Sequence, residues 1–254
     1  MKAVYLIIIS LYSTIVLPQN AHANLEVEYQ VVHNIDLPFK MFCTLYIRDN
    51  ASIYSEKYTT KENLKDNIDN GGASPARGGI PDLYFKTDYN KKELLYFDES
   101  IQYLSLIKDI YTELAWNISS ETKEIAGYTC NKATVSYRGR NWVTWFAPEI
   151  PAAFGPWKLH GLPGLILEAH DTGNIYTMLA VKIQNNKESN LFDKEFSTLV
   201  KARNKQPISL KQYLEEYEES LNNIHHELAA QSSGSLTFTR APRSGMELMY
   251  EWEK

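Results

Sequence analysis

The sequence predicts a mainly β domain: a curled antiparallel sheet or open β-barrel with one packed amphipathic α-helix. Three observations lead to this prediction. Apolar and polar residues alternate with a period of two along much of the chain. Turn-forming residues separate these runs at fairly even spacing, and one stretch alone shows clear helical periodicity.

The strand prediction is clearest near the beginning of the chain. Leu25, Val27, Tyr29 and Val31 alternate with polar residues, and residues 39–47 show the same pattern. Such alternation is typical of strands that bury one face and leave the other in water. Further strands are expected at residues 52–58, 83–89, 93–98, 102–108, 111–118, 130–138, 141–146, 165–169 and 175–183, with a weak one at 236–239.

Two stretches depart from this rhythm. Residues 61–81 are polar and rich in Asn, Asp and Gly, which predicts a mobile surface loop. Leu210, Leu214, Tyr217 and Leu221 recur at intervals of three and four, which predicts a helix extending to about residue 228. A capping-box pattern at residues 209–212 marks its start. We expect this helix to lie on the sheet or to fill part of a barrel's mouth.

The first residues are typical of a secretory signal peptide. Lys2 precedes an apolar run to Leu17, and Ala21-His22-Ala23 fits the small-x-small cleavage pattern. We therefore expect cleavage near Ala23, a single domain over residues 24–254, and a periplasmic or secreted protein. No later apolar run is long enough for a membrane span, so an integral membrane protein is not expected. The net charge of −5 and the lack of a basic face argue against binding to nucleic acid.

The chain has two cysteines, Cys43 and Cys130, and both follow the predicted cleavage point. Cysteines of an exported protein pair by default, so a disulfide is expected here. The alternative is a metal site, which would need further ligands close to each cysteine in the sequence, and none is present.

Residues 148–164 contain seven prolines and glycines, a density that excludes a helix or a central strand. The same stretch carries Phe154, Trp157 and Leu162, whose side chains need to leave water. We therefore expect an apolar loop packed in one defined shape. Two interpretations remain open: the loop forms the rim of a binding site, or it plugs the end of the sheet with its own core.

Several segments of this region resemble the GLPGLI family. They are residues 127–134, 138–146, 148–151 and 155–160, followed by Gly161-Leu162-Pro163-Gly164-Leu165-Ile166. The resemblance implies an exported protein of Gram-negative bacteria without an established activity, of a kind often grouped with outer-membrane receptors. The overall plan is also similar to the open, curled sheet of periplasmic lipoprotein carriers such as LolA-like domains.

The sequence contains no recognised catalytic motif, and no cofactor is expected. The leading hypothesis is a non-enzymatic binding protein that holds a hydrophobic small molecule, lipid or peptide against an apolar concave sheet face. Its ligand-binding residues would be Trp145, Phe154, Trp157, Leu162 and Arg140.

Two other hypotheses remain. The loop could dock the chain onto a partner such as an outer-membrane receptor. Alternatively, His160, Glu168 and His170 could hold a zinc ion, as in a metal-dependent hydrolase, if the fold brings them together.

Overall fold

The computed structural model describes residues 24–35, 38–56, 83–99, 104–185, 194, 196–198, 200–201, 206–231, 238–239 and 242–253. The predicted signal peptide and the predicted mobile loop at residues 61–81 lie outside these ranges. The described strands are β1 (Leu25–His33), β2 (Phe39–Arg48), β3 (Ala51–Glu56), β4 (Leu83–Asp88), β5 (Glu93–Glu99), β6 (Leu104–Asp109), β7 (Asn117–Ile125), β8 (Tyr128–Tyr137), β9 (Arg140–Ala147), β10 (Leu165–Asp171), β11 (Tyr176–Asn185) and β12 (Ile208–Ser209).

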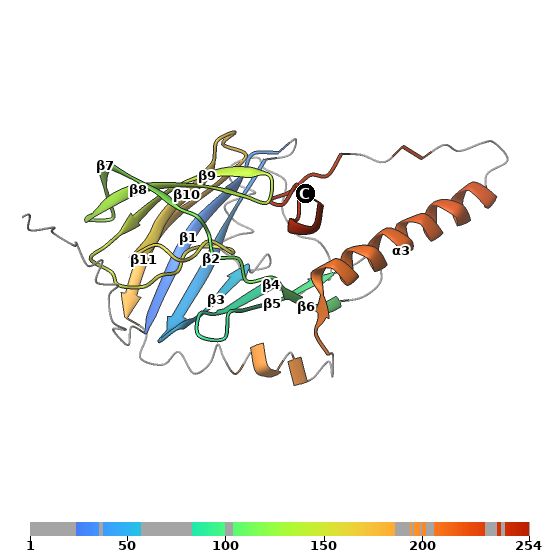
Figure 1. The fold of residues 1–254 in the computed structure, drawn as a ribbon, viewed down its shortest axis with the longest axis horizontal. Coiled ribbons are helices and arrows are strands. Elements are labelled where there is room, and N and C mark those ends of the chain that lie inside the picture. Colours follow the sequence, from blue (N-terminus) through green and yellow to red (C-terminus); the bar gives the residue numbers. More distant parts are fainter. Residues whose placement is uncertain are drawn as a thin grey trace, which may run out of the picture.

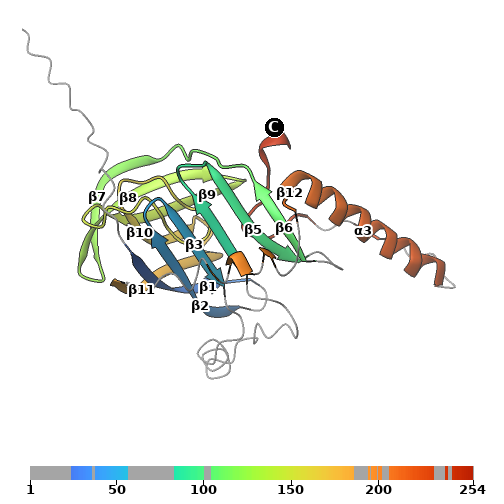
Figure 2. The same cartoon turned by 90° about the horizontal axis from the view of Figure 1, so that it is seen from below.

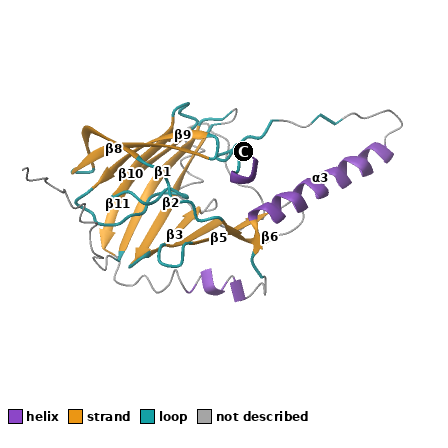
Figure 3. Cartoon of the chain, in the orientation of Figure 1, coloured by secondary structure: helices purple, strands orange, loops and turns teal. Residues whose placement is uncertain are grey.

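These strands form one sheet in the order β12-β6-β5-β4-β3-β2-β1-β11-β10-β9-β8-β7. The sheet curls but does not close, as Figures 1 and 3 show. All neighbours are antiparallel except β12 and β6. Bulges interrupt the pairing of β1 with β11, of β9 with β10 and of β7 with β8, and bulges increase strand bending. The predicted mainly β, curled open sheet is confirmed.

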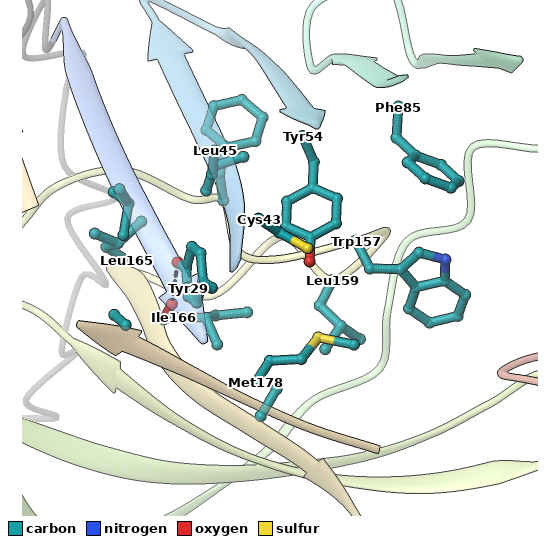
Figure 4. Close-up of a cluster of buried hydrophobic side chains, with 14 of the residues drawn as sticks. Tyr29, Cys43, Leu45, Tyr54, Phe85, Trp157, Leu159, Leu165, Ile166 and Met178 are labelled. Atoms are coloured by element: carbon teal, nitrogen blue, oxygen red, sulfur yellow. Dashed lines mark hydrogen bonds between the residues drawn. The ribbon is translucent and has the colours of Figure 1, made fainter. Parts of the chain in front are cut away.

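The interior of the curl is apolar. Tyr29, Cys43 and Leu45 point inward from β1 and β2, and Met178 does so from β11 (Figure 4). The Tyr29 hydroxyl donates a hydrogen bond to the carbonyl oxygen of Ile166 at 2.6 Å. This pairing satisfies a polar group that would otherwise be buried without a partner.

Both cysteines are free, so the predicted disulfide is wrong. Cys43 lies on β2, which pairs with β1 and β3, whereas Cys130 lies on β8, which pairs with β7 and β9. A disulfide requires the two Cα atoms to lie within about 7 Å, and these strands are not neighbours. Burial raises the pKa of the Cys43 thiol well above its usual value and that of Cys130 to about 11, so both thiols are protonated near neutral pH.

The predicted helix is present as α3 (Leu210–Gln231). The Ser209 hydroxyl accepts a hydrogen bond from the backbone N–H of Gln212 at 3.1 Å, which confirms the predicted N-cap. Only Leu210 and Tyr213 of the helix are buried, and beyond them α3 extends away from the sheet, as Figures 1 and 2 show. Its first turn contacts β6 and β12, so the helix is attached at one end and does not lie along the sheet.

Candidate functional site

A cavity of about 410 Å³ opens beside the inner face of the sheet, and we call it the aromatic cavity. Strands β1, β2, β4, β5 and β11, the loop at residues 148–164 and the C-terminal segment all contribute to its walls. Half of these residues carry aromatic rings, His33 included, and a few are charged. The lining residues are His33, Ile35, Phe39, Leu83, Phe85, Tyr96, Phe97, Asp98, Trp157, Lys158, Tyr176, Ser244, Gly245, Met246, Glu247 and Tyr250.

The loop at residues 148–164 is packed in one shape, as its sequence predicts. Phe154 forms an isolated bridge with His160, and the carbonyl of Phe154 accepts a hydrogen bond from Ile166 at 3.0 Å. Phe154 and Leu162 are buried in the main core and are not among the residues that line the aromatic cavity. Of the three large apolar residues named from the sequence, only Trp157 lines the aromatic cavity.

Trp157 is held in an unusual backbone conformation, with φ at 56°. Left-handed backbone is uncommon outside glycine and costs about 1 kcal/mol or more, so the surroundings must impose it. The indole ring packs on Trp142, with ring centroids 5.5 Å apart, and on Tyr137 at 5.8 Å. The loop thus places one large ring rigidly in the cavity wall, where Figure 4 shows it opposite Phe85.

The other rings of the cavity form paired surfaces. Phe85 stacks on Tyr96 with centroids 5.1 Å apart. The imidazole of His33 lies between Phe39 at 4.4 Å and Tyr176 at 5.1 Å. Burial lowers the pKa of His33 to about 4, so this ring is neutral at physiological pH. The walls therefore offer flat apolar faces to a ligand.

At one side of the cavity lies a largely buried group of five charged residues, which we call the ion cluster. Asp109 at the end of β6 accepts two hydrogen bonds from Arg138, at 2.7 and 2.8 Å, and one from Lys158 at 2.8 Å. Glu247 bonds to both cations, and Glu251 bonds to Arg138 at 3.1 Å. The Arg138 and Asp109 side chains are almost fully buried, at 1% and 0% exposure. Each buried charge is therefore neutralised by direct partners.

The ion cluster fixes the C-terminal segment, residues 242–253, to the sheet. Glu247 and Glu251 belong to this segment, and the carbonyl of Arg138 also accepts backbone hydrogen bonds from Leu248 and Met249. Arg140 adds a further attachment, because it donates to the carbonyl of Gly245 from Nε at 2.8 Å. Since residues 244–247 form one wall of the aromatic cavity, these bonds maintain the shape of that cavity.

Asp109 should make the protein lose stability in acid. Burial alone would raise the pKa of Asp109, but Lys158 and Arg138 outweigh burial and hold this pKa below its ordinary value. A carboxyl group of this kind stabilises the fold above its unfolded pKa of about 4, and the stabilisation is lost as the pH falls through the folded pKa. We expect urea midpoints to be level above about pH 5 and to drop below about pH 4. In Asp109→Asn the drop should be shallower, and a slope equal to that of the wild type would contradict this assignment.

Trp145 and Arg140 lie away from the interior of the cavity. Thr144 and Phe146 are buried, and because side chains alternate along a strand, Trp145 points to the opposite face of β9. There the ammonium group of Lys123 lies 4.4 Å from its ring centroid. Arg140 does not line the cavity itself but contacts two residues that do, because it lies over the Tyr176 ring at 4.8 Å and donates to the carbonyl of Gly245.

The three candidate metal ligands do not form a metal site. Glu168 is bonded to Lys123 at 2.7 Å and lies 3.6 Å from the ring of His170. His160 is buried in the loop, where its Nδ1 lies 2.8 Å from the carbonyl of Lys158 and its ring packs on Tyr111. Within the described residues, no group of three or more His, Cys, Asp or Glu side chains is arranged to hold an ion. Among the same residues, no helix is both long and apolar enough to cross a membrane.

Sequence reasoning missed most of the ion cluster. Asp109, Glu247 and Glu251 belong to no motif, and they lie 29 to 113 residues from Arg138 along the chain. The two arginines beside the hairpin turn at Gly139 are the only local signal, because paired arginines near a turn can bind carboxylates.

The comparisons with known proteins find similarity to an N-glycanase domain over part of the chain. Residues 98–206 match a family model described as the N-terminal domain of N-glycanase peptide. Two solved structures titled "PNGF-II", in the P21 and C2 space groups, share the fold with TM-scores of 0.53 and 0.51. Each is 16% identical to this chain, and they cover 78% and 77% of it. This chain spans about a third of those chains, 34% and 33%. No curated protein sequence matches it.

These matches correct the resemblance to the GLPGLI family. The family model that matches is the N-glycanase domain, and the similar structures are those of PNGF-II, so the assignment to the GLPGLI family is wrong. The motif at residues 161–166 has a structural explanation within this chain. Leu162, Leu165 and Ile166 are buried in the core, and Gly164 packs directly against the backbone of Ala147.

Proposed function

We propose that this chain is an exported, glycan-binding module that holds part of a glycan in the aromatic cavity. The observation that carries the proposal is the combination of rigid rings with charged groups around one cavity: Trp157, Tyr96 and Phe85 line it together with Asp98, Lys158 and Glu247. Pyranose rings have apolar C–H faces that pack on aromatic rings, and they have hydroxyl groups that need donors and acceptors. A wall of this composition suits both.

Size and charge support the same ligand class. A cavity of about 410 Å³ is at the small end for ligand pockets and suits about two sugar rings. Its charged residues are two carboxylates and one lysine, with His33 neutral, so the walls do not attract strongly anionic molecules. The match to an N-glycanase domain makes an asparagine-linked glycan the natural candidate. The signal-peptide pattern at residues 1–23 supports a location outside the cytoplasm, where such glycans occur.

Calorimetric titration with N,N′-diacetylchitobiose and with an oligomannose glycopeptide tests the proposal. We expect dissociation constants between about 10 µM and 1 mM, and Trp157→Ala should weaken binding at least about tenfold, because it removes the rigid central ring. Trp145→Ala is the matched control, since this tryptophan lies on the opposite sheet face. The affinity of this variant for both sugars should equal that of the wild type.

Trp157 is itself buried, so its replacement can also disturb the fold. Phe39→Ala provides a second test, because Phe39 lines the cavity but is only partly buried. Thermal melts should accompany both variants. Two results would overturn the proposal: no sugar binding by a folded wild type, or equal losses in Trp145→Ala and Trp157→Ala. Displacement of a fatty-acid probe, with no response to either sugar, would instead support the carriage of a hydrophobic ligand.

A further inference from the structure

A second and larger hollow lies between α3 and the C-terminal segment, next to the aromatic cavity, with which it shares Ser244, Glu247 and Tyr250. Its volume is about 1140 Å³, and we call it the helix groove. Its floor contains Leu214, Tyr217 and Leu221 of α3, and the other side carries Phe238 and Trp252.

The helix that forms the floor has little support of its own. After its first turn, α3 projects from the body of the sheet in both views, Figures 1 and 2. Leu214, Tyr217 and Leu221 are only partly buried, and Leu228 further along is 46% exposed. Helices gain most of their stability in water from packing of an apolar face. A helix of 22 residues with a half-covered apolar stripe therefore suits a partner that covers it.

The charges around the groove select the partner. Helix α3 carries five glutamates and one lysine. Five glutamates line the groove, against Lys211 and Arg243, and Glu247 among them is already paired with Arg138 and Lys158 in the ion cluster. The other four are Glu215, Glu218, Glu219 and Glu253, so acidic residues still outnumber basic ones. Arg243 is already engaged, because its two terminal nitrogens bond to the carboxylate of Glu253 at 2.8 and 2.9 Å. The groove is therefore apolar along its floor and negative along its rim.

We propose that the helix groove binds an amphipathic, basic segment of a partner protein in a helix-in-groove arrangement. Apolar side chains of that segment would cover Leu214, Tyr217 and Leu221, and its lysines or arginines would face the rim glutamates. From Leu214 to His225 the floor extends about 17 Å, which matches about three turns of a bound helix.

The same charges disfavour two other occupants. A second copy of this chain would bring its own acidic helix against this one, so the carboxylates would repel. A bilayer surface with anionic headgroups would repel the helix for the same reason, because interfacial helices are usually basic. Only a basic partner gains from both the floor and the rim.

Fluorescence anisotropy with a labelled 14-residue Leu/Lys amphipathic peptide tests this proposal on the chain from residue 24 onward. A Leu/Glu peptide with the same apolar positions is the matched probe. We expect the Leu/Lys peptide to bind at least about tenfold more tightly, with the difference shrinking in high salt. The double variant Glu215→Lys/Glu219→Lys and the variant Leu221→Ser should each weaken binding about tenfold or more. Glu227→Lys, on the same helix but outside the groove, should change it less than about threefold.

Circular dichroism should show that α3 stays helical in each variant. Equal affinity for the two peptides, or equal effects of Glu227→Lys and the groove variants, would overturn the proposal. Dimer formation in sedimentation that Leu221→Ser abolishes would assign the groove to a second copy instead. Binding to anionic vesicles in a co-flotation assay would assign it to a membrane surface. Glu215, Glu219 and Leu221 line only the helix groove, and Trp157 and Phe39 line only the aromatic cavity, so the variants let the two proposals succeed or fail separately.

Discussion

Arg138→Met is expected to lower the free energy of unfolding by about 3–5 kcal/mol, because it leaves buried carboxylates without their main partner. Arg138 is the centre of the ion cluster: it donates two hydrogen bonds to Asp109 and contacts Glu247 and Glu251. After the replacement, Lys158 is the only cation that the described residues leave on Asp109, whose side chain is fully buried and also accepts a hydrogen bond from the backbone N–H of Ile110. Methionine retains an aliphatic stem and the same backbone requirement at φ 47°, so the change isolates the charge.

Urea denaturation measures this loss, and Arg243→Met is its matched control. Arg243 forms an equally direct pair with Glu253, but both side chains are about one-third exposed. Exposed pairs contribute less than about 1 kcal/mol, so the control should remain close to the wild type. Similar losses in the two variants would mean that the cluster is no more important than a surface pair. Because the cluster attaches the wall at residues 244–247, Arg138→Met should also weaken sugar binding in the aromatic cavity.

The sequence predicted the strands that bury one face. Over most of their length, strands β1 and β2 alternate between buried and partly exposed residues, which matches the alternation of apolar and polar residues in the sequence. Strand β7 was missed because it lies at the edge of the sheet, pairs only with β8 and exposes residues on both faces. The strand expected at residues 111–118 is wrong for most of its length, since residues 110–116 have no regular structure. There the Trp116 indole donates to the carbonyl of His160, so packing on the loop replaces strand pairing. Phe238 and Thr239, from the weak strand expected at 236–239, are not in a strand either.

The candidate site was predictable only where a single residue stands out. Trp157 is a large ring in a loop that cannot join regular structure, and it does line a cavity. Trp145 lies on the other face of the sheet from this cavity, because side chains alternate along β9 and its neighbours Thr144 and Phe146 are the buried ones. The ion cluster and the C-terminal wall depend on contacts between distant parts of the chain, which local patterns do not encode. The same holds for the cysteines, whose pairing depended on a strand order that the sequence does not specify.

Gly164→Ala is expected to destabilise the fold by about 3 kcal/mol or more, because the added Cβ atom would overlap the backbone of a neighbouring segment. A Cβ atom at Gly164 would lie 2.7 Å from the carbonyl carbon of Ala147 and 2.9 Å from the Cα of Pro148. Both are backbone atoms. Ala147 is the last residue of β9, and it pairs with Leu165, the first residue of β10. No side-chain rotation can relieve this contact, so either the loop or the strand pair must shift.

Gly127→Ala separates this clash from the ordinary cost of losing a glycine. Gly127 has φ at 81° but nothing within 4 Å of an added Cβ, so only backbone strain of about 1–2 kcal/mol is expected there. Thermal and urea denaturation of the two variants give the comparison. If Gly164→Ala costs no more than Gly127→Ala, the loop is not held as closely against β9 as the structure shows. A larger loss at Gly164 would mean that the second glycine of the loop motif is required for the close approach of two backbone segments, whatever the cavity binds.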